Sequence, residues 1–411
     1  MKILHTADWH VGRLIKGRSR ADEHRAVLAE IVELATRERV DVAIVAGDLF
    51  DHASPAPEAE EIVYAALLAL ADGGAQVVLV AGNHDHPRRL AAVRPLLART
   101  GRVHAGAVMA RPGEGGVVTF ATASGERARV ALFPFLSQRG IVRADDLMRG
   151  EAADHAQAYA ERAAAIVGAL CQPFGADTVN LLVAHLLAGG ALGSGSERAA
   201  HMHDDYRVPA QCFDHPALHY VALGHVHAPQ RVPAPCPVWY CGSPLQLDFG
   251  ESANEPGVLV VEARAGKPAE VERHALSAGH RLRTVRGTLE SIAAEIARAG
   301  DDYLRVEITG PPRPGLADQV RALGPERVVE VRIVGEQAAG GAEDDQDTVD
   351  RLRQQPREIF AEYLAELGLA ESVNDGDGPA GDGAGRAGPG AAAVLAMFDE
   401  LLEEADAPDA S

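Results

Sequence analysis

Cysteine is scarce in this sequence, and no two cysteines form a CxxC pair. A zinc ribbon and a thioredoxin-type redox motif are therefore excluded. No apolar run reaches the roughly 18 residues that a membrane-spanning helix needs. The first residues form a strand-like segment, with none of the basic and apolar regions of a secretion signal. We therefore expect a cytoplasmic protein that does not contact a membrane.

Positive charge is also in short supply, since the formal net charge is −20 at pH 7. An excess of negative charge of this size argues at first against a nucleic-acid partner. From residue 341 to residue 411, however, Asp and Glu outnumber Lys and Arg 18 to 4, which accounts for −14 of the total. Residues 1–340 carry only −6. The charge distribution therefore weakens the objection to a nucleic-acid partner.

The strongest local signal is the stretch Gly82-Asn83-His84-Asp85-His86, which directly follows the apolar run 76–81. Such a run is typical of a buried strand. Four other apolar runs also end in polar side chains, namely Asp8 and His10, Asp48, His185, and His225 and His227. In α/β sheets the loops at the carboxyl ends of the strands converge and form ligand sites. The pattern predicts an α/β fold with one shared site.

These side chains have the chemistry of a metal centre. The candidate ligands are Asn83 and the six side chains Asp8, His10, Asp48, His185, His225 and His227. Seven oxygen and nitrogen ligands exceed what one ion ordinarily takes from a protein, but they suit two ions that share a carboxylate, for which Asp48 is the natural candidate. A set without cysteine favours Mn²⁺ or Fe²⁺ over structural zinc. Two such ions catalyse in-line phosphoryl displacement. Because Asp8 and His10 are two residues apart, an extended strand exit would turn both to the same side.

The rest of the chain divides into further expected elements. Residues 22–39 and 58–72 are predicted to form helices, and the apolar residues of the second helix suit either core packing or a second subunit. Residues 281–335 alternate between strands and helices and are expected to form a small α+β unit. A polar linker at 336–348 precedes two helical segments within 349–405, which are separated by a Gly- and Pro-rich stretch that we expect to be disordered.

The five motifs together resemble those of the calcineurin-like metallophosphoesterases. The motifs are Asp8-Trp9-His10, Gly47-Asp48-Leu49-Phe50-Asp51, Gly82-Asn83-His84-Asp85, His185 and Gly224-His225-Val226-His227. The resemblance implies one metal held by Asp8, His10, Asp48 and His227. It implies a second metal held by Asp48, Asn83, His185 and His225, with His84 acting on the phosphate. Some relatives place another catalytic histidine three residues after the bridging aspartate, where this chain has Asp51 followed by His52, so that role is not transferred.

Within that family the chain is similar to DNA nuclease subunits that work with a coiled-coil ATPase. This similarity implies a two-sheet sandwich flanked by helices in residues 1–270, a DNA-binding cap in 281–335 and an ATPase-binding tail in 349–405. It also implies a homodimer within a heterotetramer, formed through helices near the N-terminus. The expected function is ATP-regulated, Mn²⁺-dependent exonuclease and endonuclease action on DNA ends and hairpins, in repair, recombination and replication at the nucleoid. The alternatives are a phosphoesterase for small phosphodiesters or phosphoproteins, and a scaffold without catalysis.

Overall fold

The computed structural model describes residues 1–123, 125–137, 140–141, 159–194, 197, 202 and 206–334. The linker expected at 336–348 and the tail expected at 349–405 lie outside these ranges. Among the described residues, no helix combines the length and the apolar character needed to cross a membrane.

The first of two six-stranded sheets has the strand order β16-β15-β1-β4-β5-β6. Its strands are β1 (Lys2–Thr6), β4 (Val42–Val45), β5 (Gln76–Val80), β6 (Val103–Gly106), β15 (Gly257–Arg264) and β16 (Lys267–Ala275). The four N-terminal strands are parallel, whereas β15 runs antiparallel to β1. The carboxyl ends of β1, β4 and β5 therefore meet at one edge of this sheet.

The second sheet has the strand order β13-β14-β12-β9-β8-β7. Its strands are β7 (Val117–Ala121), β8 (Arg127–Phe133), β9 (Val179–His185), β12 (Tyr220–Gly224), β13 (Gln230–Val232) and β14 (Val238–Tyr240). The central four strands are parallel and the two edge strands are antiparallel. A short pair, β10 (Leu187–Ala188) and β11 (Arg207–Val208), lies beyond β9.

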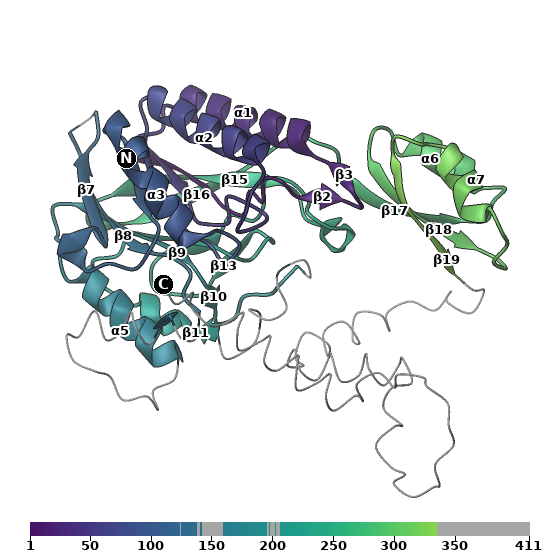
Figure 1. Cartoon of the computed structure of the whole chain (residues 1–411). Helices are drawn as coiled ribbons and strands as arrows, with labels where there is room; N and C mark the ends of the chain where they lie inside the picture. The colour runs from purple at the N-terminus through teal and green to yellow at the C-terminus, as the bar shows by residue number, and fades with distance from the viewer. Residues whose placement is uncertain are drawn as a thin grey trace, which may run out of the picture. The chain divides into compact units, whose positions relative to one another are not determined.

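The two sheets pack face to face, and apolar side chains fill the space between them (Figure 1). Ile44 and Val80 from the first sheet share this core with Val130 and Val183 from the second. Since both faces of the central strands are covered, their sequences are continuous apolar runs rather than alternating ones. The expected α/β sandwich of two sheets is confirmed.

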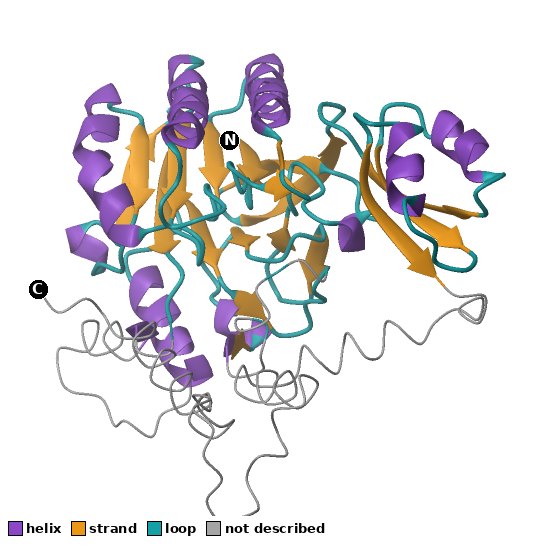
Figure 2. Ribbon diagram, turned by 45° about the vertical axis from the view of Figure 1, so that its right-hand side comes forward, coloured by secondary structure: helices purple, strands orange, loops and turns teal. Residues whose placement is uncertain are grey.

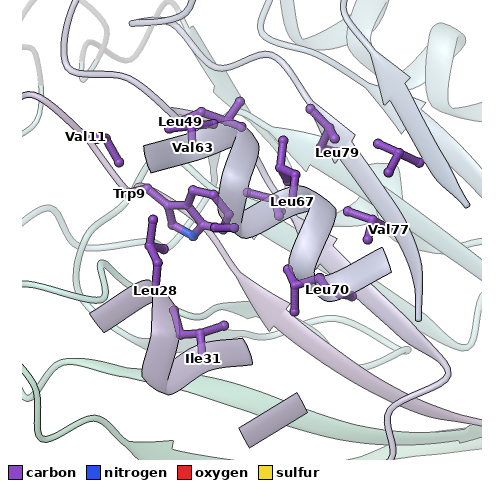
Figure 3. Packing of buried hydrophobic residues seen from close by; sticks show 14 of the residues in the cluster. Trp9, Val11, Leu28, Ile31, Leu49, Val63, Leu67, Leu70, Val77 and Leu79 are labelled. Atoms are coloured by element: carbon purple, nitrogen blue, oxygen red, sulfur yellow. The ribbon is translucent and has the colours of Figure 1, made fainter. Parts of the chain in front are cut away.

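Helices cover the outer faces of the sandwich (Figure 2). The bounds are α1 (Ala21–Glu38), α2 (Pro57–Asp72), α3 (Pro87–Leu97) and α5 (Tyr159–Cys171). The first two pack on the first sheet around Trp9, whose fully buried ring lies near Leu28 and Ile31 (Figure 3). The Trp9 indole N–H donates to the Thr6 hydroxyl over 2.9 Å, so burial leaves its donor satisfied. Trp9 thus fixes the segment between the proposed ligands Asp8 and His10.

The C-terminal part of the described chain forms a separate small sheet with its own core. Its elements are β17 (Leu282–Gly287), α6 (Ile292–Arg298), β18 (Tyr303–Thr309), α7 (Leu316–Ala322) and β19 (Val328–Val334). The expected alternation of strands and helices is confirmed. All three strands are parallel, however, so this part of the chain is an α/β unit rather than the expected α+β unit. We refer to residues 282–334 as the cap.

Several elements were not predicted from the sequence, among them α3, the edge strand β16 and a short N-terminal hairpin. The edge strand β16 runs through residue 270, where we expected the nuclease domain to end. Its side chains are mostly exposed and four of its nine residues are charged, as is usual at a sheet edge, so it lacks the apolar pattern of a buried strand. The hairpin of β2 (Leu14–Ile15) and β3 (Arg18–Ser19) has strands of only two residues, too short for any periodicity to show.

Glu330 joins the cap to that hairpin. It accepts hydrogen bonds from Arg305 at 2.7 Å and from Arg332 at 3.0 Å, and the Lys16 ammonium lies 3.3 Å away. Partial burial would raise the pKa of Glu330, but the hydrogen bonds from Arg305 and Arg332 outweigh it and bring the pKa to about 2. The folded state therefore favours the ionised carboxylate more strongly than the unfolded chain does.

Glu330→Gln is accordingly expected to lower the melting temperature at neutral pH, through a loss of about 1 kcal/mol. Because the folded pKa lies below the unfolded value, this contribution is complete above pH 5 and fades as the pH falls toward 2. Melting curves of both proteins between pH 7 and pH 3.5 measure it. The matched control is Glu326→Gln, since Glu326 is 90 % exposed. If the difference in melting temperature between Glu330→Gln and the wild type stays constant down to pH 3.5, the prediction is contradicted.

Candidate dinuclear metal centre

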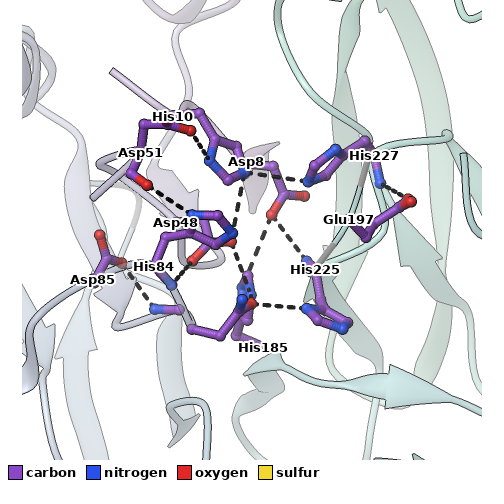
Figure 4. Close-up of polar contacts among 12 residues, drawn as sticks. Asp8, His10, Asp48, Asp51, His84, Asp85, His185, Glu197, His225 and His227 are labelled. Atoms are coloured by element: carbon purple, nitrogen blue, oxygen red, sulfur yellow. Dashed lines mark hydrogen bonds and ion pairs between the residues drawn. The ribbon is translucent and has the colours of Figure 1, made fainter. Parts of the chain in front are cut away.

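Polar side chains from both sheets meet at one end of the sandwich (Figure 4). The loops after β1, β4 and β5 supply one half, and the ends of β9 and β12 supply the other. The structure brings together all seven candidate ligands and His84. Six of the ligands are buried, and Asn83 is half-buried. The residues are Asp8, His10, Asp48, Asn83, His84, His185, His225 and His227.

The backbone turns sharply at several of these positions. Asp8 has φ 53°, His10 φ 45°, Asp48 φ 50° and His225 φ 103°, a region that residues with a Cβ rarely adopt. The expectation that Asp8 and His10 leave an extended strand is therefore wrong. Their side chains converge because the loop is held by backbone hydrogen bonds, from Asp8 N to Gly47 O and from His10 N to Asp48 O, each 3.0 Å long. Strain of this kind is concentrated at functional sites.

Two glycines allow the loops to approach closely. A Cβ on Gly82 would collide with the Asp48 carboxylate and backbone, and a Cβ on Gly224 would collide with the carbonyl oxygen of Ala46. The second contact crosses from one sheet to the other, directly before His225. Only glycine fits where backbone meets backbone in this way.

Asp8, His10 and His227 form the first group of candidate ligand atoms, which all lie within 4.8 Å of one another. The Nε2 atoms of His10 and His227 face each other at 3.2 Å. Asp8 Oδ1 accepts the His225 N–H at 2.9 Å, whereas the buried Asp8 Oδ2 has no hydrogen-bond partner among the described residues. A buried carboxylate oxygen without a donor is costly unless a cation compensates it. The group therefore fits a divalent metal ion.

Asp48, His185, Asn83 and His225 form the second group. His185 Nε2 lies 3.4 Å from Asp48 Oδ2 and 2.9 Å from Asn83 Oδ1, and Asn83 Oδ1 lies 2.9 Å from His225 Nδ1. Asp48 also lies 3.5 Å from His10 of the first group. Its carboxylate is thus placed between the two sets of ligands, as a bridging ligand requires.

Hydrogen bonds fix the orientation of two of the histidines. His185 Nδ1 lies 2.8 Å from the Ala46 carbonyl, and His227 Nδ1 lies 2.8 Å from the Glu251 carboxylate. In each case Nδ1–H donates, which turns Nε2 toward the centre. Burial alone would lower the pKa of both rings, but Asp48 raises the pKa of His185 to about 9 and Glu251 raises that of His227 to about 10. The surroundings thus stabilise positive charge, which favours cations.

His84 is held next to both groups. Its backbone N–H donates to Asp48 Oδ1 at 2.8 Å, and its Nδ1 lies 2.8 Å from the carbonyl oxygen of Asp51. The ring stands edge-on to the His10 ring, with 4.6 Å between the centroids. Because Nδ1–H donates to a carbonyl, any proton exchange by this ring takes place at Nε2.

The structure assigns positions to three carboxylates that sequence patterns left without a role. Asp51 faces His10 Nδ1 at 3.4 Å and Arg13 at 3.2 Å, while the neighbouring His52 is 73 % exposed. Asp85 accepts the backbone N–H of Gly82 at 2.8 Å and that of Phe50 at 3.1 Å, which ties two ligand loops together. Glu251 binds His227. Asp51 and Asp85 lie inside the motifs, but Glu251 lies outside them and no sequence pattern singled it out.

Comparison with known proteins agrees with this geometry. A family model for calcineurin-like phosphoesterases matches residues 1–229, which is more than half of the chain. A second model, described as the type 5 capsule protein repressor C-terminal domain, matches residues 279–367. The chain therefore belongs to the calcineurin-like phosphoesterases, which makes it a metal-dependent phosphodiesterase.

Three of its relatives carry a name that identifies them as the SbcD component of the nuclease SbcCD. The Rhodobacter capsulatus protein is 38 % identical over 65 % of this chain and 67 % of its own length. The Bacillus subtilis protein is 34 % identical over 69 % of this chain and 71 % of its own length. The Escherichia coli K12 protein is 30 % identical over 91 % of this chain and 92 % of its own length. Within the phosphoesterases, the chain is thus a member of the SbcD group.

Proposed function

We propose that this chain is the DNA-cleaving component of an SbcCD-type complex and hydrolyses phosphodiester bonds with two Mn²⁺ ions. The observation that carries the proposal is the position of Asp48 between two groups of buried ligands, with His84 bonded to it. In this proposal Asp8, His10, Asp48 and His227 hold one ion. Asp48, Asn83, His185 and His225 hold the other. The relatives named as components of the nuclease SbcCD support a nucleic acid as the substrate.

The residues divide the work of the reaction. Two bound ions supply the nucleophilic hydroxide and stabilise the charge that develops on the phosphate. His84, fixed through Asp51 and Asp48, stabilises the phosphoryl group or protonates the leaving oxygen from Nε2. Asp51 orients His10, and Asp85 holds the turn at Gly82 against the turn after Asp48. A set of nitrogen and oxygen ligands without cysteine suits Mn²⁺.

The cap supports a polymeric substrate over a small one. A phosphoesterase for small phosphodiesters or phosphoproteins needs no added domain, whereas the resemblance to the Escherichia coli relative extends over 91 % of this chain. In the layout we propose, residues 1–270 are the nuclease domain and 281–335 the DNA-contacting cap. On the face of the cap sheet away from its helices, the half-exposed side chains of Arg286 and Arg332 are held by Glu307 and Glu330. To contact a DNA phosphate, these arginines would therefore exchange their carboxylate partners for the phosphate.

Two further surfaces fit the proposed complex. An apolar groove of about 490 Å³ runs between α1 and α2, lined by Leu28, Val32 and Ile62, and Leu68 on α2 is 38 % exposed. We propose that this face joins two copies of the chain, within a heterotetramer that contains two copies of an SbcC-type coiled-coil ATPase. Residues 349–405 have apolar residues at helical spacing, and we propose them as the ATPase-binding segment, separated from the cap by the linker 336–348. Such a complex would act in DNA repair at the nucleoid.

The test is release of nucleotides from end-labelled linear duplex DNA in the presence of Mn²⁺, with and without SbcC and ATP. His84→Ala is expected to lower the rate at least about 100-fold while Mn²⁺ is still bound, because a proton-transfer group is lost and no proposed ligand changes. His86→Ala is the matched control, since His86 is exposed and only caps α3. Full activity of His84→Ala contradicts the assigned role. Turnover of a small phosphodiester without any DNA cleavage would support the alternative enzyme.

A further inference from the structure

The loop that follows β14 lies between the metal centre and the cap. Its sequence, Gly242 to Glu251, lies outside the five motifs, and none of its residues is among the seven candidate ligands. Leu245, Gln246, Leu247, Phe249 and Glu251 are all buried. A loop with this much buried polar and apolar surface is a structural connector rather than a solvated turn.

One end of the loop holds a proposed metal ligand. Glu251 is 1 % exposed, and its Oε1 lies 2.8 Å from His227 Nδ1. Its other oxygen, Oε2, accepts the backbone N–H of Leu247 at 2.7 Å. The carboxylate is therefore fixed by the loop itself and in turn fixes the His227 ring. A carboxylate behind a ligating histidine sets its tautomer and its orientation.

The other end of the loop holds the cap. Gln246 is 3 % exposed, and its side-chain oxygen accepts the N–H of Leu282, the first residue of β17, at 2.7 Å. Its side-chain nitrogen donates to the carbonyl oxygens of Glu251 at 3.2 Å and of Asn254 at 2.8 Å. One amide thus connects the backbone of the cap to the backbone of Glu251.

A second contact strengthens the junction with the cap. The Arg305 guanidinium of β18 lies 4.4 Å from the centroid of the Phe249 ring. Phe249 also packs with Ile15 of the hairpin and with Leu282 of the cap. Stacking and burial of this kind oppose sliding of the cap sheet over the loop.

We propose that Gln246 and Glu251 are positioning residues that couple the place of the cap to the orientation of His227. The inference rests on the proposed function, since it takes His227 as a metal ligand. A shift of β17 moves the Gln246 amide through its hydrogen bond with Leu282. Because that amide also donates a hydrogen bond to the backbone carbonyl of Glu251, the Glu251 carboxylate then moves relative to the His227 ring. Coupling of this kind is reciprocal, so a metal ion on His227 must also stabilise the attachment of β17.

In the first part of the test, calorimetry measures the binding of Mn²⁺ to the metal-stripped full-length chain. Glu251→Gln is expected to weaken the binding of one of two ions about 10–100-fold, and Glu251→Asp to restore part of the affinity. The matched control is Glu255→Gln, which changes a nearby exposed carboxylate whose partner among the described residues is Arg273. Unchanged Mn²⁺ affinity in Glu251→Gln overturns the proposal.

The second part is hydrogen exchange of the Leu282 amide with and without Mn²⁺. Mn²⁺ is expected to slow this exchange in the wild type and to have no effect on it in Gln246→Leu, a variant whose proposed ligands are all intact. An equal effect of Mn²⁺ in both proteins refutes the coupling. A wild type that binds two Mn²⁺ ions but cleaves no DNA would refute the nuclease proposal alone, because both readouts of the coupling need only the metal.

Discussion

Asp48→Asn is expected to reduce phosphodiester hydrolysis at least about a thousandfold, which corresponds to about 4 kcal/mol. The Asp48 carboxylate lies 3.5 Å from His10 of the first ligand group and 3.4 Å from His185 of the second, so the loss of its charge affects both ions. The substitution is otherwise mild, because asparagine tolerates the left-handed φ of 50° and its amide oxygen can still accept the His84 N–H. The expected defect is therefore electrostatic rather than a failure to fold.

Hydrolysis assays together with Mn²⁺ titration measure this effect. Asp48→Asn should bind fewer than two ions and should melt as a cooperative unit. Asp41→Asn is the matched control, since Asp41 directly precedes β4, and among the described residues its side chain accepts only the Lys2 N–H. If Asp48→Asn retained two tightly bound ions, Asp48 would not be the bridging ligand.

Gly224→Ala is expected to destabilise the fold by about 3 kcal/mol or more, since the added methyl group collides with backbone from the opposite sheet. The colliding atom is the carbonyl oxygen of Ala46, which also binds His185 Nδ1. Neither strand can yield without opening the core between the sheets. The same displacement moves His225, so metal binding should weaken along with stability.

Urea denaturation and Mn²⁺ titration of Gly224→Ala test both effects. The matched control is Gly168→Ala on the exposed face of α5, where an added Cβ meets nothing within 4 Å. That change should stabilise the protein slightly, because alanine favours a helix by about 1 kcal/mol over glycine. A wild-type midpoint for Gly224→Ala would mean that the sheets are not packed as closely there as the structure shows.

The membership of the candidate site could be predicted because its signal is local. Each candidate ligand lies at the end of a buried strand or in the loop just after it, and β1, β4, β5, β9 and β12 place their carboxyl ends together. An apolar run followed by a polar residue is visible without any knowledge of pairing. The assignment of ligands to individual ions came only from the resemblance, since spacing alone does not tell which side chains meet.

The supporting contacts could not be predicted because they depend on tertiary structure. Glu251 is 24 residues from His227, and no periodicity connects the two. The left-handed conformations of Asp8 and His10 come from hydrogen bonds to the loop after β4, which is distant in sequence. Strand order was also beyond the sequence, as the pairing of β1 with β15 joins residues more than 250 positions apart.

That pairing has a consequence for how the protein is made. Ribosomes add roughly 5–20 residues per second, so β15 follows β1 by more than about ten seconds. Throughout that interval one edge of β1, a strand with Ile3 and Leu4 fully buried in the final fold, has no neighbour in the sheet. Exposed apolar edges of nascent sheets are the surfaces that chaperones protect. His227 is also synthesised late, so a nascent chain cannot assemble the complete proposed metal centre until its second sheet has been synthesised.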